Sequence, residues 1–239
     1  MPIKSVSFEN NNFDISYEIV NPSCEKDIIF LHGWGSNKDI MKTSFGSHLK
    51  KFRHIYIDMP GFGKSPNTQI LTTNKYIQII DLLLEKLLSD KFIIAGHSYG
   101  GKIATSLNPK NLVLLSSAGI IEEKNSNIKI KILFSKILKN LGLGFLSKFF
   151  RSKDVDNMPQ NMYETFKNVL NEDYSKNFEN YKGNALIFWG QKDTATSLKS
   201  GEKISNLIKK SSFVSYDSDH YFFLKNSKDI CERIENGIL

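Results

Sequence analysis

Phe92-Ile93-Ile94-Ala95-Gly96-His97-Ser98-Tyr99-Gly100-Gly101 is the stretch of sequence that decides the fold. Its first four residues form an apolar run of the kind found in buried strands, and a short helix is expected after the stretch, to about Leu107. The five residues from Gly96 to Gly100 fit the G-x-S-x-G pattern of a tight strand-to-helix turn. Such a turn strains the backbone of its central residue, which is tolerable only where the flanking residues lack bulk. The pattern therefore predicts that Ser98 stands exposed at the end of a strand.

Further strands and helices are expected on both sides of this turn. The apolar runs and turn signals place strands at residues 3–8, 13–19, 27–31, 54–58, 111–115, 184–189 and 211–216, with Asn10-Asn11-Asn12 as the first turn, and helices at 73–88 and 220–236. The first of these helices is expected to carry one apolar side, made of Ile77, Ile80, Leu84, Leu87 and Leu88. Strands that alternate with helices imply right-handed crossovers and a mostly parallel sheet covered on both faces. The fold class is α/β.

The length of 239 residues suits one large α/β domain, residues 1–239. From about residue 119 to 182, basic and amphipathic helical sequence interrupts the alternation of strands and helices. We expect this stretch to be a lid inserted over the sheet, with its apolar side roofing the active site.

The net charge of +7 is concentrated in that insertion. Residues 124–153 hold eight basic residues and no acidic one, and without them the net charge falls to −1. A solvated helix face explains this run, but it could also dock an acidic partner such as acyl carrier protein or lie against anionic lipid. Nucleic acid is not an expected partner.

Compartment and cofactors are predicted from what the sequence lacks. Cys24 and Cys231 have no metal-binding spacing, the first residues do not form a signal peptide, and no apolar run approaches the ~18 residues of a membrane span. We expect a cytoplasmic enzyme with reduced thiols and with no metal or cofactor.

A serine hydroxyl is a poor nucleophile without a base, and the sequence offers one. His220 follows the last expected strand and Asp193 follows the strand before it, so both are expected at the strand edge where Ser98 lies. The order Ser, Asp, His predicts Ser98 as nucleophile, His220 as general base and Asp193 as the orienting acid. Asp217 and Asp219 compete with Asp193, although both are interpreted as turn formers.

Two further loops are expected at the same edge. In His32-Gly33-Trp34-Gly35, the Trp34 backbone N–H could face the substrate oxygen opposite the Tyr99 N–H, forming an oxyanion hole. The Trp34 side chain is expected to line the acyl pocket. The turn from Asp58 to Ser65 is expected to support the site from the side.

The remaining histidines are interpreted as non-catalytic. His32 and His97 are expected to be structural, and His48 and His54 to be structural or exposed.

Together, the His-Gly-Trp-Gly, Asp-x-Pro-Gly-x-Gly-x-Ser, Gly-His-Ser-x-Gly-Gly and Trp-Gly-x-x-Asp segments, with the late histidine, resemble the α/β-hydrolase superfamily over residues 1–118 and 184–239. The resemblance implies eight strands with the second antiparallel, a triad at Ser98, Asp193 and His220, and oxyanion donors at Trp34 and Tyr99. The first two segments are also similar to those of esterases that cleave pimeloyl methyl ester from acyl carrier protein.

The residues thus predict a hydrolase that cleaves a carboxylic ester or similar acyl bond of a small molecule through an acyl-enzyme. Three alternatives stay open: an esterase for substrates linked to acyl carrier protein, a carbon–carbon bond hydrolase, and a non-catalytic protein that binds a ligand in the same pocket.

Overall fold

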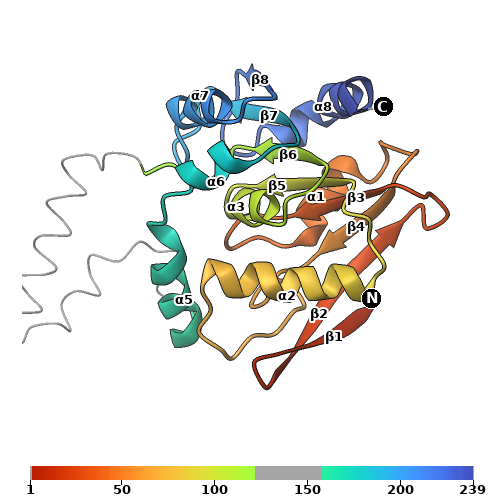
Figure 1. Cartoon of the computed structure of the whole chain (residues 1–239), viewed down its shortest axis with the longest axis vertical. Helices are drawn as coiled ribbons and strands as arrows, with labels where there is room; N and C mark the ends of the chain where they lie inside the picture. Colours follow the sequence, from red (N-terminus) through yellow and green to blue (C-terminus); the bar gives the residue numbers. More distant parts are fainter. Residues whose placement is uncertain (1, 122–157, 239) are drawn as a thin grey trace, which may run out of the picture.

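One eight-stranded sheet organises the computed structural model, which describes residues 2–121 and 158–238 (Figure 1). The strands are β1 Ile3–Phe8, β2 Asn11–Val20, β3 Asp27–Leu31, β4 Arg53–Ile57, β5 Ile93–His97, β6 Asn111–Leu115, β7 Asn184–Gly190 and β8 Ser211–Tyr216, in the spatial order β1-β2-β4-β3-β5-β6-β7-β8. Strand β2 pairs antiparallel with both β1 and β4, and all later pairs are parallel. The mixed sheet confirms the predicted α/β fold with an antiparallel second strand.

Helices cover both faces of this sheet. They are α1 Lys38–Phe45, α2 Thr73–Lys86, α3 Tyr99–Ser106, α5 Gln160–Leu170, α6 Ser175–Asn180, α7 Leu198–Leu207 and α8 Phe223–Ile238. Buried side chains of α2, α3 and α7 belong to the core on one face, and those of α1 and α8 to the core on the other. The sequence did not predict α1 or α7.

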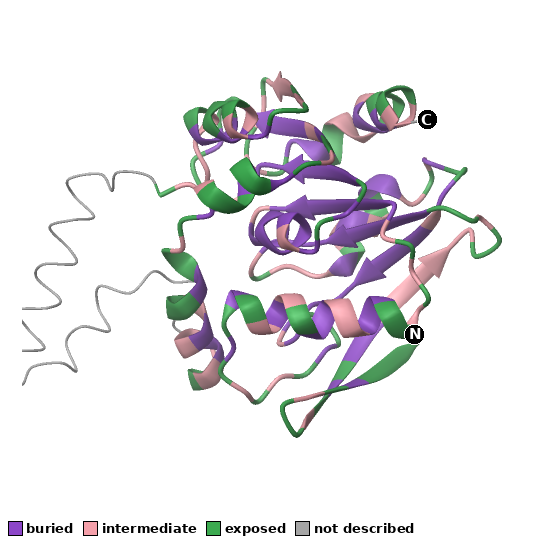
Figure 2. Cartoon of the chain, viewed as in Figure 1, coloured by how far each residue is buried: buried purple, intermediate pink, exposed green. Residues whose placement is uncertain are grey.

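The central strands are buried on both faces, as Figure 2 shows in purple. Their apolar residues therefore run without the polar alternation of a half-exposed strand. In β3, the fully buried Phe30 ring stacks on Phe45 of α1 and on Tyr56 of β4, with centroids 5.1 and 4.7 Å apart. These rings attach α1 to the sheet.

Two local predictions are corrected by the structure. The first hairpin turns at Glu9 and Asn10, both with positive φ, and not at residues 10–12. Leu88 was placed on the apolar side of its helix, but α2 ends at Lys86 and the Leu88 side chain is 87% exposed. The apolar face of α2 is instead built around Tyr76, Ile80 and Leu83.

The expected lid falls partly outside the described residues. Helices α5 and α6 lie in the second half of the predicted segment, whereas residues 122–157, which include the whole basic run and its apolar positions, lie outside. Within the described ranges, no helix has both the length and the apolar character needed to span a membrane.

The Phe30 stack generates a stability prediction. Phe30→Ala removes a fully buried ring from between two aromatic partners, so we expect a loss of about 3–5 kcal/mol in the free energy of unfolding, measured by urea denaturation. Leu88→Ala is the matched control and should change the free energy by less than about 0.5 kcal/mol. Equal effects of the two substitutions would contradict this description of the core.

Candidate active site

Ser98 has the strained backbone expected for its turn. It lies between β5 and α3 with φ 51° and ψ −116°, and its N–H donates to the Leu115 carbonyl over 3.0 Å. A Cβ on Gly96 would lie 2.4 Å from the Gly100 carbonyl oxygen, and one on Gly100 would lie 2.4 Å from that of Leu31. Both positions therefore require glycine, and together they press α3 against the ends of β3 and β5.

His220 and Asp193 are brought together from the loops after β8 and β7. The His220 Nδ1–H donates to Asp193 Oδ2 over 2.6 Å. The other oxygen, Oδ1, accepts the backbone N–H groups of Ala195 and Thr196 at 2.8 and 2.9 Å, and the Thr196 hydroxyl donates to Oδ2 at 2.9 Å. This set of donors fixes the carboxylate and, through it, the histidine ring.

The electrostatics of Asp193 favour the carboxylate form. Burial alone would raise the pKa of this carboxyl, but the hydrogen bonds from His220, the Thr196 backbone and Ser116 outweigh burial and lower its pKa to about 2. Asp193 is thus ionised at neutral pH and can stabilise an imidazolium at His220.

The two competing carboxylates do not contact His220 through their side chains. Asp217 forms an exposed ion pair with Lys192, and Asp219 Oδ1 accepts the N–H of Tyr221. Both act in the turn, as the sequence suggested.

Ser98 lies near the His220–Asp193 pair, because the ring of its neighbour His97 packs against the His220 ring. The His97 and His220 rings have centroids 4.5 Å apart, and His97 Nε2 lies 3.1 Å from the His220 carbonyl oxygen. Among the described residues, the Ser98 hydroxyl has no hydrogen-bond partner, His220 included. Catalytic hydrogen bonds of this kind are often long without substrate and tighten when it binds.

His32 and His97 are buried and neutral, in agreement with their structural interpretation. Burial is the main cause that lowers the pKa of His32 to about 4 and that of His97 to about 3. The His32 ring lies between the Gly33 carbonyl and the Met59 N–H, which donates to Nε2 over 3.1 Å. His54 is also buried, between the Tyr56 hydroxyl and the Leu49 carbonyl, near the start of β4 and so at the opposite end of that strand from the Asp58 turn.

The loop that begins at His32 lies directly against Ser98. A Cβ on Gly33 would be 3.1 Å from Ser98 Cβ, so glycine is needed for this approach. In the part of the chain that the structure describes, neither the Trp34 nor the Tyr99 backbone N–H donates to a protein acceptor. Tyr99 begins α3, where first-turn N–H groups have no partner within the helix.

The Trp34 side chain forms part of an aromatic wall beside this loop. Its indole contacts the rings of Phe62, Tyr99 and Phe166, with centroids 4.8, 5.6 and 5.3 Å away. These rings come from three separate segments, so the wall joins the Asp58–Ser65 turn, the Ser98 helix and α5.

A buried ion pair holds the supporting turn. The Lys38 ammonium donates to Asp58 Oδ2 over 2.7 Å, and both side chains are 1% exposed. Asp58 also accepts the backbone N–H groups of Lys38 and Lys64, and these bonds lower its carboxyl pKa although burial opposes the shift. The pair connects the start of α1, which follows the Trp34 loop, to the turn; nothing in the sequence pattern singled out Lys38.

A second buried lysine ties the described part of the insertion to the Ser98 helix. Lys102 of α3 donates to the Val169 carbonyl at 2.6 Å and to Glu172 at 3.0 Å. Thr73 donates to the same Glu172 oxygen and accepts from the Tyr99 hydroxyl at 3.3 Å. Burial lowers the Lys102 pKa, and the Glu172 carboxylate partly offsets this effect.

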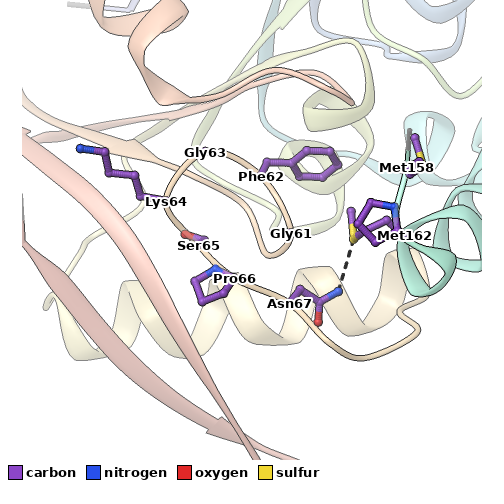
Figure 3. Close-up of a pocket in the computed structure, with 10 residues that line it drawn as sticks. Gly61, Phe62, Gly63, Lys64, Ser65, Pro66, Asn67, Met158 and Met162 are labelled. Carbon is purple, nitrogen blue, oxygen red and sulfur yellow. Dashed lines mark hydrogen bonds between the residues drawn. The ribbon is translucent and has the colours of Figure 1, made fainter. Parts of the chain in front are cut away.

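An open hollow lies beside the Asp58–Ser65 turn, with Phe62 in its lining (Figure 3). Its volume is about 360 Å³, and it is lined by residues 61–67 together with Met158, Pro159 and Met162. Asn67 Nδ2 approaches the Met162 sulfur at 3.5 Å across its floor.

Two residues that position Asp193 belong to no sequence motif. Thr196 bonds Asp193 through both backbone and hydroxyl, and Ser116, at the end of β6 with φ 45°, receives the Thr196 hydroxyl on its carbonyl at 3.1 Å. The one local signal was the run of small and hydroxyl residues after Asp193.

Comparison with known proteins agrees with this geometry. A family model described as the alpha/beta hydrolase fold matches residues 27–168, more than half of the chain. The chain belongs to the α/β-hydrolase family.

Two curated relatives are similar over most of this α/β hydrolase. Both are named pimeloyl-[acyl-carrier protein] methyl ester esterase: that of Wigglesworthia glossinidia brevipalpis is 28% identical over 80% of this chain and 70% of its own, and that of Pseudoalteromonas atlantica is 25% identical over 77% and 60%. An esterase structure from Thermogutta terrifontis superposes with a TM-score of 0.76 at 16% identity, covering 99% of this chain and 98% of its own, and shows the shared fold. The comparisons confirm the predictions of an α/β-hydrolase fold and of an α/β-hydrolase enzyme related to esterases.

The low pKa of Asp193 predicts how stability responds to pH. Because the folded pKa of about 2 lies below the unfolded value of about 3.9, the ionised carboxylate contributes stability above about pH 4 that is lost as the pH falls toward 2. The difference in unfolding free energy between wild type and Asp193→Asn should therefore shrink by roughly 2 kcal/mol between about pH 6 and pH 2, measured by urea denaturation.

Asp217→Asn is the matched control, since its side chain is 72% exposed and its ion pair is solvated. A pH-independent effect of Asp193→Asn would show that the carboxylate is not held in ionised form by its donors.

Proposed function

We propose that this enzyme is a serine hydrolase that cleaves a carboxylic ester through an acyl-enzyme. The observation that carries the proposal is the 2.6 Å bond from His220 to Asp193, formed by the ring that packs against the neighbour of the strained Ser98. A nucleophile, a base and an orienting carboxylate are then available at one strand edge, in the chain order of this fold.

In the proposed mechanism, the Ser98 oxygen attacks the ester carbonyl carbon while His220 Nε2 takes the hydroxyl proton. Asp193 holds the Nδ1–H tautomer and stabilises the imidazolium. The carbonyl oxygen becomes an oxyanion that accepts the Trp34 and Tyr99 N–H groups, which have no acceptor among the described residues. The alcohol leaves with the proton from His220, and water then releases the acid by the same steps.

The chain is proposed to act as a single domain, with residues 119–182 inserted between β6 and β7. Helix α5 and the loop that follows it support this organisation, since Phe166 of α5 contacts the Trp34 ring and Glu172 of the loop binds Lys102. The insertion would supply the roof of an apolar acyl pocket whose wall includes Trp34.

Hydrolysis of p-nitrophenyl acetate and butyrate tests the proposal. Ser98→Ala should reduce kcat/KM by at least about 10³-fold without changing the fold, because the oxyanion donors alone leave only residual catalysis. Ser47→Ala, at an exposed position, should retain full activity. Equal turnover by wild type and Ser98→Ala, or failure of a fluorophosphonate to label Ser98, would favour a non-catalytic ligand-binding protein.

A second candidate is an esterase whose substrate is carried by acyl carrier protein. Two observations favour it: the printed names of the two relatives, and the acid-free basic run at residues 124–153. An acidic carrier would be attracted to such a run and would be released by salt.

Charge reversal separates the two candidates. Lys129, Lys131 and Lys136 changed together to Glu should weaken binding of an acyl carrier protein at least about tenfold at low salt, while p-nitrophenyl butyrate hydrolysis stays unchanged. The matched control reverses three exposed lysines of α6 and α7, Lys176, Lys199 and Lys203. Unchanged carrier affinity in the first variant would leave the small-molecule esterase as the function.

A further inference from the structure

A row of lysines lies at the end of the sheet opposite the candidate active site, where the parallel strands begin. Because β3 to β8 run in parallel, their N-terminal ends share one edge and the catalytic loops share the other. A lysine stands one or two residues before each of these strands: in the spatial order of the sheet they are Lys51, Lys26, Lys91, Lys110, Lys182 and Lys210. With strands about 4.8 Å apart, the row extends roughly 24 Å. We call it the basic edge.

Most lysines of the basic edge form no ion pair, although Glu232 and Glu235 of α8 line the same hollow as Lys51. Lys91 pairs with Asp81, and the neighbouring Arg53, the first residue of β4, pairs with the buried Asp27. Within the described ranges, no carboxylate lies within ion-pairing distance of the other five lysines of the row. The ammonium groups of Lys26 and Lys110 even converge on the ring of Phe92, at 4.8 and 5.2 Å from its centroid. Both ammonium groups lie over the same aromatic ring, although each lysine is exposed to solvent.

Helix geometry explains only part of this row. Crossover helices end at this edge, and cations there interact favourably with their C-terminal carbonyl groups. That effect calls for one cation per helix end, whereas Lys50-Lys51 and Lys209-Lys210 are exposed pairs. The extra charge is not needed by the helices.

An exposed apolar side chain projects from the middle of the basic edge. Leu88, in the loop between α2 and the central strand β5, is the most exposed large hydrophobic residue of the described chain, at 87%. Its carbonyl accepts from Arg53 at 3.2 Å, and Arg53 is bound to Asp27, the neighbour of Lys26. Leu88 is thus held at the junction of β3, β4 and β5 with lysines on both sides.

We infer that the basic edge docks on an anionic lipid surface, with Leu88 entering the headgroup region. Lysines around one protruding apolar residue match the chemistry of a diffuse negative surface with an apolar interior. Lysine is a mobile point charge, whereas specific phosphate recognition in nucleic acids favours the fixed fork of arginine, and the one arginine of this edge is already paired. Docking in this orientation points the Ser98 loops away from the bilayer, so that substrate would arrive from water.

Vesicle flotation at low salt tests the inference. Wild type should bind vesicles of phosphatidylcholine with about a third phosphatidylglycerol, and should not bind vesicles of phosphatidylcholine alone. Reversal of Lys26, Lys51 and Lys110 to Glu should reduce partitioning at least about 100-fold, since each lysine near such a surface contributes roughly fivefold. Hydrolysis of a p-nitrophenyl ester should be unchanged in this variant, which confirms folding.

Two matched triples locate the contact. Reversal of Lys176, Lys199 and Lys203 changes the net charge equally and should retain binding, as should reversal of Lys129, Lys131 and Lys136 in the insertion. Leu88→Trp should give an indole emission that shifts to the blue when anionic vesicles are added. The inference is overturned if wild type does not bind, if the basic-edge variant binds as wild type does, or if the insertion triple is the one that loses binding. Capture of an acidic protein or duplex DNA by the basic edge, without vesicle binding, would overturn it too.

Discussion

The close approach of backbone to backbone around Ser98 is the constraint on which the site depends. Gly96 and Gly100 allow α3 to start within touching distance of the ends of β3 and β5, where any side chain would meet a carbonyl carbon or oxygen. This contact forces the positive φ of Ser98 and leaves the first-turn N–H of Tyr99 without a helical acceptor. The same approach brings the Gly33 loop against Ser98. The proposed nucleophile and the proposed oxyanion donors are therefore placed by one packing requirement, at a backbone cost that the surrounding sheet sustains.

His220, the proposed general base, is held by a different principle, the satisfaction of a buried carboxylate. Asp193 could not remain ionised in its buried position without donors, and it obtains them from His220, from two backbone N–H groups and from the Thr196 hydroxyl. All of these donors except His220 come from the loop of Asp193 itself, so three hydrogen bonds hold the carboxylate independently of the histidine. The His220 ring is then confined between this oxygen and the His97 ring.

The strands and the position of the candidate site could be predicted from the sequence, because both depend on short local patterns. The runs at 27–31 and 111–115 match their strands residue for residue, since both faces of a central strand are apolar. The run at 211–216 also matches its strand, although β8 lies at the edge of the sheet and its side chains are mostly half-buried. Ser98, Asp193 and His220 each follow a strand, which places them at one edge once the sheet is known to be parallel. The sequence does not reveal ion pairs between residues that are far apart along the chain. Lys38 and Asp58 form a buried ion pair, and the buried Lys102 pairs with the partly exposed Glu172. In both cases the residues look like solvated surface in the sequence. Leu88 fitted the helical period, but period alone does not reveal that the helix ends two residues earlier.

The Lys102 tether has a consequence for how such an enzyme can diversify. The ammonium belongs to α3, the helix that follows Ser98, whereas its acceptors, Val169 and Glu172, belong to the segment between β6 and β7. Replacement of the whole segment by an unrelated one would leave the Lys102 ammonium buried without its partners. New substrate contacts would have to outweigh this loss of stability. Substitutions that change specificity are therefore easier to accommodate before Val169 than at Val169 and Glu172 themselves. Lys102 therefore constrains how this segment can change during evolution. Residues before Val169 can vary, whereas the partners of the lysine, Val169 and Glu172, are retained.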